Sequence, residues 1–332
     1  MKQLVLISCL GALLLSMNVL AQKPELKFNP DKKFKIVQFT DAHIKPGDPA
    51  SDVVFETVAK VLDTEKPDLV VLTGDIVTGQ PAQKGWDAIT ALIIQRKIPF
   101  ATVLGNHDDE QDLTRAQLAQ QVEKKPFSLM VGKTENVSGY GNYVIPIRSA
   151  VGKSAAENLY FMDSNAYTTI EGVGTYGWFK NDQVQWFRDQ SKKISKANDG
   201  KTIPALAFFH IPLPEYNQAY RNEKNPPIGV RLENEASPTL NSGMFAAMLE
   251  SGDVTGMFVG HDHINDYVSY LYGVALCYGR FTGGKTTYGD LPNGGRIIEL
   301  TEGNRSFRTW IRTGEGEVLL PVNFPEDLLP KK

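Results

Sequence analysis

Apolar and polar positions alternate with a clear period over the first third of the chain. Short apolar and β-branched runs of strand length occupy residues 34–40, 69–72 and 98–104. Between them, apolar residues recur at helical spacing over residues 52–64 and 82–96, which predicts two amphipathic helices. This β-α-β-α-β order is typical of a parallel sheet whose binding site lies beyond the carboxyl ends of its strands.

The rest of the chain is less regular. Helices are predicted at residues 113–124, 182–197 and 243–250, and strands at residues 142–147, 158–162, 204–209, 254–259, 266–272, 274–278, 296–300 and 306–311. The last four strands, joined by short turns, predict a second, mostly antiparallel sheet. Residues 211–242 are rich in Pro, Asn and Glu. A loop of this length in a compact domain is functional or disordered, and we expect a lid beside the site.

The first 21 residues have the pattern of a secretory signal peptide. Lys2 precedes an apolar run at residues 4–15, which is shorter than the roughly 20 residues that a membrane span needs. We expect cleavage after residue 21 and export to the periplasm or the extracellular space. The mature chain, residues 22–332, is then expected to form a single domain without a membrane span.

Composition narrows the class of protein. The chain has 332 residues, 42% of them hydrophobic and 22% charged, with a net charge of -3. These are ordinary values for a globular protein, and the absence of a long basic run argues against nucleic-acid binding. Cys277 is the single cysteine after residue 21, so no intrachain disulfide is expected and the core must supply the stability.

All five histidines of the chain follow predicted strands, and carboxylates or an amide accompany four of them. The motifs are Asp41-Ala42-His43, Gly74-Asp75, Gly105-Asn106-His107-Asp108, His210 and Gly260-His261-Asp262-His263. Residues two apart in an extended segment point the same way, so the first motif can reach one ion. Each motif alone is weak evidence, since a lone histidine after two phenylalanines is more often a core residue. The ordered set indicates one metal centre.

The donor types indicate what this centre binds. Seven candidate ligands stand at the strand ends: Asp41, His43, Asp75, Asn106, His210, His261 and His263. They are too many for one ion, and they suit two if a carboxylate bridges. Mixed nitrogen and oxygen donors favour divalent or trivalent iron, manganese, zinc or cobalt, and the lack of thiolates argues against a structural zinc site. Two such ions roughly 3.5–4 Å apart generate a hydroxide and polarise a phosphoryl group.

The remaining histidine is the candidate general acid. Asn106 is the better candidate ligand, which leaves its neighbour His107 free to protonate the leaving alkoxide. Asp108 is the second candidate catalytic residue. Either Asp108 or Asp262 could orient His107 or tune its pKa, and the sequence leaves that choice open.

The ordered motifs, over about residues 34–263, resemble those of the calcineurin-like metallophosphoesterases. The resemblance implies an α/β fold, a four-layer α/β/β/α sandwich with two mixed β-sheets, around a dinuclear metal centre. Residues 243–284 are similar to the purple-acid-phosphatase-related branch that includes the yeast Dcr-type phosphatases. By position, the resemblance implies one ion held by Asp41, His43, Asp75 and His263, and a second, bridged by Asp75, held by Asn106, His210 and His261. It also implies that His107 faces the substrate phosphate.

One position departs from the family's better-known members. Three residues after the bridging aspartate, this chain has Thr78. In the family that the chain resembles, purple acid phosphatases have a metal-ligating tyrosine at this position. Ser/Thr protein phosphatases have an aspartate there, which pairs with the catalytic histidine. We therefore expect no tyrosinate-to-iron colour.

The substrate side is the least determined from sequence. Candidate pocket residues are Glu215, Tyr216, Arg221, Arg231, Asn241, Arg280, Tyr143, Tyr176 and Trp178. The partner expected is a small phosphate ester. The first hypothesis is a secreted phosphomonoesterase that acts through a metal-bridging hydroxide, the second a phosphodiesterase on the same centre. The third, a metal-bearing binding protein without catalysis, is disfavoured because all seven ligands and His107 are present.

Overall fold

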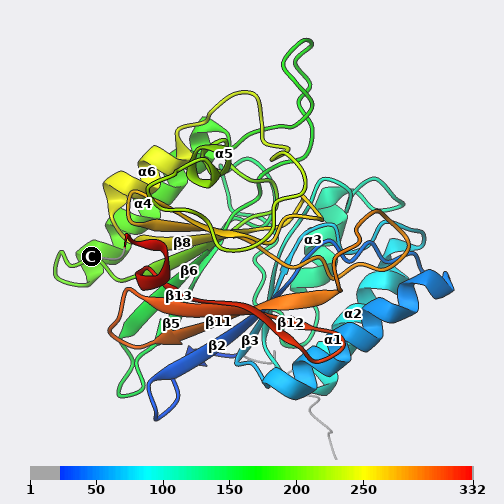
Figure 1. The fold of residues 1–332 in the computed structure, drawn as a ribbon, viewed down its shortest axis with the longest axis horizontal. Coiled ribbons are helices and arrows are strands. Elements are labelled where there is room, and N and C mark those ends of the chain that lie inside the picture. Colours follow the sequence, from blue (N-terminus) through cyan, green and yellow to red (C-terminus); the bar gives the residue numbers. More distant parts are fainter. Residues whose placement is uncertain (1–22, 331–332) are drawn as a thin grey trace, which may run out of the picture.

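The computed structural model describes residues 23–330. Two mixed β-sheets face each other, and helices cover their outer faces (Figure 1). The predicted four-layer α/β/β/α sandwich is therefore confirmed. The signal peptide predicted for residues 1–21 lies outside the described residues.

The six-stranded sheet carries the first half of the site. Its strand order is β13-β12-β11-β2-β3-β4. The parallel strands are β2 (Lys33–Phe39), β3 (Leu69–Thr73) and β4 (Phe100–Val103). The antiparallel strands are β11 (Gly294–Thr301), β12 (Phe307–Thr313) and β13 (Val318–Phe324).

The C-terminal strands do not form a sheet of their own, so that prediction was wrong. β11 pairs with β2 over most of its length, from Arg296 opposite Gln38 to Thr301 opposite Lys33. Its side chains are largely buried on both faces of the sheet, as is typical of an interior strand, and it lies between β2 and β12 in the six-stranded sheet. Strand β13 was not predicted from the sequence.

The seven-stranded sheet has the order β1-β5-β6-β7-β8-β10-β9. Its strands are β1 (Leu26–Lys27), β5 (Tyr143–Arg148), β6 (Ala155–Phe161), β7 (Ala205–Phe208), β8 (Val254–Val259), β9 (Val268–Leu271) and β10 (Val274–Tyr278). Strands β6, β7, β8 and β10 are parallel, β5 is antiparallel to β6 and parallel to β1, and β9 is antiparallel to β10.

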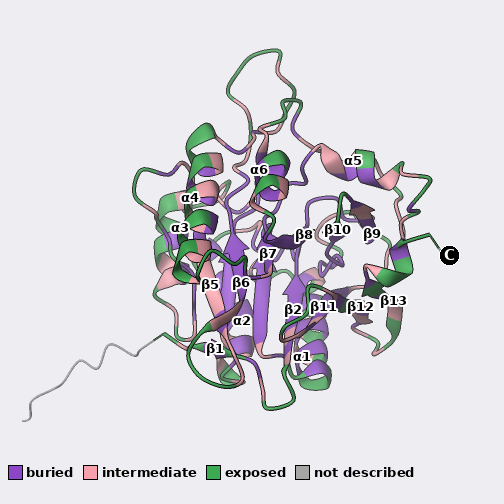
Figure 2. Ribbon diagram, turned by 90° about the vertical axis from the view of Figure 1, so that its left-hand side faces the viewer, coloured by how far each residue is buried: buried purple, intermediate pink, exposed green. Residues whose placement is uncertain are grey.

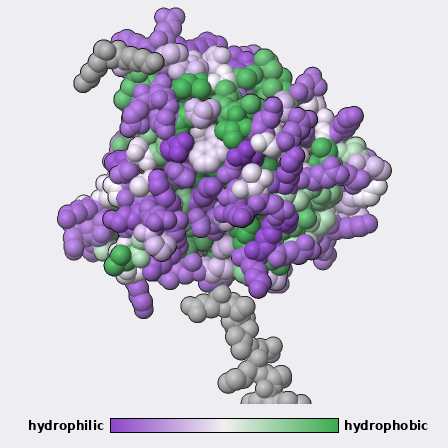
Figure 3. Space-filling model, turned by 60° about the horizontal axis from the view of Figure 1, so that its bottom comes forward, coloured by the Kyte–Doolittle hydropathy of each residue, from purple (hydrophilic) through white to green (hydrophobic). Residues whose placement is uncertain are grey.

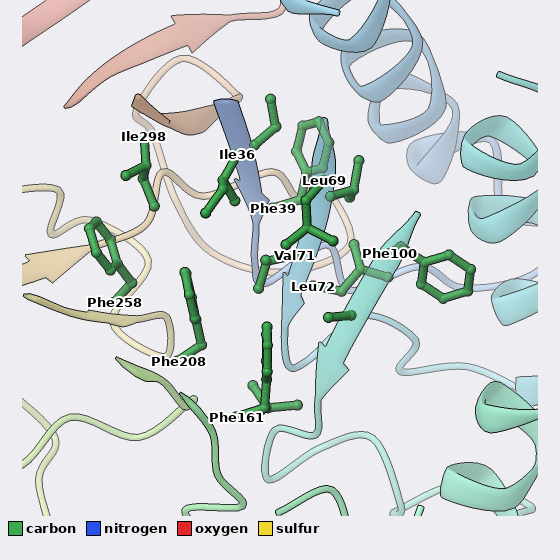
Figure 4. Close-up of a cluster of buried hydrophobic side chains, with 14 of the residues drawn as sticks. Ile36, Phe39, Leu69, Val71, Leu72, Phe100, Phe161, Phe208, Phe258 and Ile298 are labelled. Carbon is green, nitrogen blue, oxygen red and sulfur yellow. The ribbon is translucent and has the colours of Figure 1, made fainter. Parts of the chain in front are cut away.

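The space between the sheets is filled by the side chains in Figure 4. Aliphatic residues of the six-stranded sheet, among them Ile36 and Val71, face a row of phenylalanines on the other sheet. The rings of Phe161, Phe208 and Phe258 stack with centroids 5.2 and 5.4 Å apart. Burial of this many large apolar side chains is the main source of stability in a chain with one described, free cysteine.

Helices form the outer two layers. α1 (Asp52–Glu65) and α2 (Ala82–Gln95) pack on the six-stranded sheet. α4 (Asn181–Ala197), α5 (Glu215–Tyr220) and α6 (Met244–Ser251) pack on the seven-stranded sheet. α3 (Arg115–Glu123) packs into the same hydrophobic core as α1 and α2. Single 3-10 turns lie at Pro49–Ser51 and Glu326–Leu328. Figure 2 shows the buried sides of these helices turned toward the sheets.

Residues 211–242, predicted as a loop, contain the short helix α5. The segment is fixed along β9 by bridges from Ile228 to Val268 and from Arg231 to Asn265. The face in Figure 3 is largely hydrophilic, with hydrophobic side chains in separate clusters, as in most globular proteins. Within residues 23–330, no helix has both the length and the apolar character that crossing a membrane requires.

Candidate metal centre

Six of the seven predicted ligands form two buried groups at the carboxyl ends of the strands. Asp41, His43 and His263 make one group, and Asp75, His210 and His261 make the other; the possible ligand atoms within each group lie within 4.8 Å of one another. They follow β2, β3, β7 and β8, which belong to both sheets. The two sheets therefore meet at this centre.

Asp75 joins the two groups. Its Oδ2 lies 3.1 Å from His210 Nε2 and 3.9 Å from His43 Nε2. Its Oδ1 accepts a hydrogen bond of 2.8 Å from the backbone N–H of His107. One oxygen of this carboxylate thus faces a histidine of each group, the arrangement that a bridging ligand requires.

Hydrogen bonds define which imidazole nitrogens face inward. Nδ1 of His210 lies 2.7 Å from the carbonyl oxygen of Thr73, and Nδ1 of His263 lies 2.8 Å from that of Tyr288. A nitrogen facing a carbonyl oxygen must donate, so the lone pair of each ring is on Nε2. This second-layer contact is the usual one for histidines that ligate metals.

The inward-facing nitrogen and oxygen atoms contact one another or have no hydrogen-bond partner among the described residues. Nε2 of His43 and Nε2 of His263 are 3.1 Å apart, a distance that requires a proton or a cation between two lone pairs. Asn106 Oδ1, His210 Nε2 and His261 Nε2 are buried and unpartnered within the described residues. Each such atom would cost about 1–3 kcal/mol unless satisfied. These donors fit two metal ions, and they support a dinuclear centre.

The charge states suit metal ligands. Burial lowers the pKa of His43 to about 3 and that of His261 well below its ordinary value, so both rings are neutral, the form that binds metals. His210 is the exception: burial opposes its protonation, but the carboxylates of Asp75 and Asp41 raise its pKa to about 9, so a metal ion at Nε2 would take the place of a proton there. Burial would raise the pKa of Asp75, yet the surrounding histidines lower it, and this carboxylate remains ionised.

The backbone at four ligand positions is strained. Asp41, His43, Asp75 and His261 have φ values of 52°, 45°, 52° and 81°. This left-handed conformation costs on the order of 1–3 kcal/mol per non-glycine residue and concentrates at functional sites. The strain is stored where the chain must turn a side chain back toward the centre.

The glycines of the motifs permit close approach of the strand ends. A Cβ on Gly74, whose φ is +90°, would lie 2.6 Å from Gly105 N and from His210 Nδ1. A Cβ on Gly105 would overlap the carboxylate of Asp75. The loops after β3 and β4 can therefore contact each other only through glycine.

His107 lies beside the two groups rather than in them. Its side chain is 39% exposed, and its ring centroid is 5.7 Å from that of His43. Nδ1 of His107 is 2.6 Å from Oε2 of Glu110, which the sequence interpretation overlooked. The i, i+3 spacing in a turn was the available signal for this contact.

Asp108 does not occupy the position predicted for it. Its side chain is buried, with Oδ2 accepting from the N–H groups of Asp75 and Gly105 and Oδ1 from those of Ile76 and Val77. The turn after Gly105 directs this carboxylate inward, away from the His107 imidazole. In contrast to the prediction, Asp108 holds the loops after β3 and β4 together.

Asp262 is likewise engaged elsewhere. It accepts hydrogen bonds from Tyr278 Oη at 2.5 Å and from the N–H of Ala236 at 3.2 Å. Burial raises the pKa of Asp262 to about 7. Its contact with Ala236 attaches residues 211–242 to the loop that carries His261 and His263.

Among the predicted pocket residues, all of which lie in the described part of the chain, Tyr176 contacts a candidate ligand through its ring. The centroids of the Tyr176 and His261 rings are 4.5 Å apart. The others serve the core or bind neighbours. Tyr216 and Tyr143 are buried, Arg231 pairs with Glu235, Arg280 with Asp266, Asn241 with Glu215, and Trp178 with Lys180. Arg221 caps the end of α5. Arg231 and Arg280 are thus paired with carboxylates of the chain itself.

Three aromatic or charged side chains around the centre were not predicted. Tyr288 stacks on His263 with centroids 4.1 Å apart and bonds Glu233 through its hydroxyl. Tyr167 lies beside His107. Arg115 binds the carbonyl oxygens of the loop after β4, as well as Asp163. These residues come from loops distant in sequence, and local patterns carry no signal for them.

A cavity of about 800 Å³ lies next to His263, separated from this candidate ligand by two aromatic rings. Tyr288 and Phe281 line it, and both rings stack on His263, with Phe281 at 5.1 Å. Lys285 and Asn293 provide polar groups on its wall. The cavity is large enough for the organic part of a small ester.

Comparison with known proteins gives concordant matches. A profile described as "Calcineurin-like phosphoesterase" matches residues 34–265. The chain is 36% identical over 292 residues to "Probable inactive purple acid phosphatase 29" of Arabidopsis thaliana, covering 78% of this chain and 74% of that protein. It is also 36% identical to "Phosphatase DCR2" of Saccharomyces cerevisiae, over 86% of this chain and 55% of the yeast protein.

A solved structure of similar fold is a dimetal phosphatase from Danio rerio. The TM-score is 0.57 at 13% identity, and the match covers 87% of this chain and 98% of the other. At this identity the likeness concerns the fold alone.

Proposed function

The chain belongs to the calcineurin-like phosphoesterase family, and on that basis we propose that it is a secreted, metal-dependent phosphomonoesterase. The observation that carries the proposal is the convergence of two buried donor groups that share Asp75 beside a part-exposed His107. Secretion rests on the signal-like pattern of residues 1–21.

The residues that would hold the metals are the two groups and Asn106. We assign Asp41, His43, Asp75 and His263 to one ion, and Asp75, Asn106, His210 and His261 to the other. Iron, manganese or zinc suits these donors. When bound, the two ions supply a nucleophile from water and neutralise the phosphoryl oxygens.

The protein's own groups then perform the rest of the reaction. His107, at the open side of the centre, donates a proton from Nε2 to the leaving oxygen. Burial of Asp75 and the surrounding imidazoles excludes bulk water and strengthens the local electrostatics. The ring of Tyr288 and the adjoining cavity receive the alcohol portion of the substrate.

A phosphodiesterase is the alternative for the same centre. Side-chain exposures of 39% for His107 and 40% for Glu110 leave the site open enough for a second ester group. Parallel assays with p-nitrophenyl phosphate and bis-p-nitrophenyl phosphate separate the two activities. Higher kcat/KM on the monoester supports our proposal, and the reverse order replaces it with the diesterase.

A protein without catalysis is the third possibility, since some relatives are named as probable inactive purple acid phosphatases. The complete donor set and His107 count against it here. The test is elemental analysis of purified mature protein together with both esters. Protein that carries metal yet hydrolyses neither ester would refute the proposed function.

A further inference from the structure

We propose that Glu110 and Tyr167 form a positioning relay that fixes His107 for proton donation and ties it to the metal ligand Asn106. The inference rests on the proposed function and deepens it. This chain has Thr78 where Ser/Thr protein phosphatases have the aspartate that pairs with the catalytic histidine. Glu110 is an acidic partner for His107 from a different position.

Three hydrogen bonds connect the four residues, and the hydroxyl oxygen of Tyr167 also lies 3.4 Å from Nδ1 of His107. Asn106 Nδ2 donates to the hydroxyl oxygen of Tyr167 at 3.1 Å. That hydroxyl donates to Oε1 of Glu110 at 2.7 Å, and Oε2 of Glu110 accepts from Nδ1 of His107 at 2.6 Å. Each of the three contacts has one donor and one acceptor, so the pattern is self-consistent.

Two consequences follow for the chemistry. Because Nδ1 of His107 donates to Glu110, Nε2 is the nitrogen presented to the substrate. Because the amide nitrogen of Asn106 is used by Tyr167, its Oδ1 is directed to the metal site, where it is buried and unpartnered. One tyrosine hydroxyl thus sets both a ligand and a catalytic residue.

The backbone supports this geometry locally. The N–H of Glu110 bonds the carbonyl oxygen of His107 at 3.4 Å, which places both side chains on one side of a turn. Asp109, between them, is held by Arg115 at 2.9 Å. Tyr167 arrives from the far loop, where it pairs with Tyr176 in an isolated bridge.

The relay acts in the step in which the ester bond is hydrolysed and the leaving oxygen is protonated. Water attacks phosphorus while the P–O bond to the alcohol breaks, and the electron pair of that bond stays on the leaving oxygen. That oxygen takes the proton from Nε2 of His107. The attacking water loses a proton to solvent, and the imidazole regains one from solvent. The Nδ1–H bond to Glu110 is kept throughout, so the ring does not rotate.

The experiment uses esters that differ in their need for an acid. p-Nitrophenolate leaves without protonation, whereas the alkoxide of glycerol 2-phosphate does not. Glu110→Gln should lower kcat on glycerol 2-phosphate about 100-fold and on p-nitrophenyl phosphate less than about 3-fold, because general-acid catalysis contributes roughly 10²–10⁴-fold. KM and metal content should not change. Tyr167→Phe should act in the same direction by a smaller factor.

Controls separate positioning from structural damage. Glu171→Gln changes an exposed carboxylate on the loop that carries Tyr167 and should match wild type on both esters. Combining Glu110→Gln with His107→Ala should add nothing to the loss from His107→Ala on glycerol 2-phosphate, since the two residues act as a unit.

The possible results distinguish the relay from the proposed function. Equal losses on both esters, additive losses in the double variant, or loss of metal from Glu110→Gln would overturn the relay while the phosphomonoesterase stands. Failure of metal-loaded wild type to hydrolyse either ester would instead overturn the proposed function.

Discussion

Replacing Asp108 with asparagine distinguishes a structural role from a catalytic one. Both oxygens of Asp108 accept from two backbone N–H groups each, at 2.8–3.3 Å. In Asp108→Asn, whichever way the amide is oriented, its NH₂ group faces two N–H donors. Since each unsatisfied buried donor costs about 1–3 kcal/mol, the variant should lose about 2–6 kcal/mol of unfolding free energy.

Thermal unfolding and metal analysis measure this effect. At roughly 2–4 °C per kcal/mol for a domain of 150–250 residues, Tm should fall by at least about 4 °C. The loops after β3 and β4 separate when these bonds are lost, so metal content at limiting metal should fall as well. Asp189→Asn, an exposed change on α4, is the matched control and should leave both values unchanged.

The opposite pattern would refute this reasoning. If Asp108→Asn keeps its Tm and its metal but loses turnover per bound ion, then Asp108 takes part in the reaction. The role first predicted from the sequence would then be correct, and the structural role derived from its backbone contacts would be wrong.

Three further predictions follow from the same geometry. Asp75→Asn should abolish activity and lower metal content, because it removes the shared ligand; full metal content by elemental analysis would contradict this. His107→Ala should keep its metal and lose most of its kcat on glycerol 2-phosphate, whose leaving group needs the acid; normal turnover of that ester together with lost metal would reverse our division of roles. Burial favours a higher pKa for Glu235, but hydrogen bonds from Arg231, Asn217 and Tyr267 lower that pKa to about 2. The ionised carboxylate therefore stabilises the fold above pH 4.5, and this contribution is lost as the pH falls toward 2. Glu235→Gln should therefore be about 2–3 kcal/mol less stable at pH 7, with the gap closing at acid pH in denaturant titrations.

The strand ends could be predicted because their signal is local. Each ligand motif follows an apolar run, and parallel strands in β-α-β units bring their carboxyl ends to one edge of the sheet. Asp41 and Asp75 could thus be placed together from sequence alone. The same logic extends to His210 and His261, which end parallel strands of the second sheet.

Strand partners could not be predicted in the same way. The pairing of β11 with β2 joins residues about 260 positions apart, and short turns between β11, β12 and β13 equally permit a separate sheet. The choice depends on which face each strand buries against the other sheet. That information is in the packing and not in the period of the sequence.

The surroundings of the ligands were also beyond local patterns. Tyr167 reaches Asn106 from 61 residues away and Tyr288 covers His263 from 25 residues away. Asp108 was assigned by its position next to His107, although adjacent residues in a turn point in different directions. Glu110, three residues on, has the direction that the contact needs.

Anomalous diffraction from crystals of the active, metal-loaded enzyme tests the central claim most directly. Our account predicts two ions roughly 3.5–4 Å apart, one among Asp41, His43 and His263 and one among Asp75, His210 and His261, with the Asp75 carboxylate between them. A fully active enzyme with a single ion, or with ions away from Asp75, would contradict it.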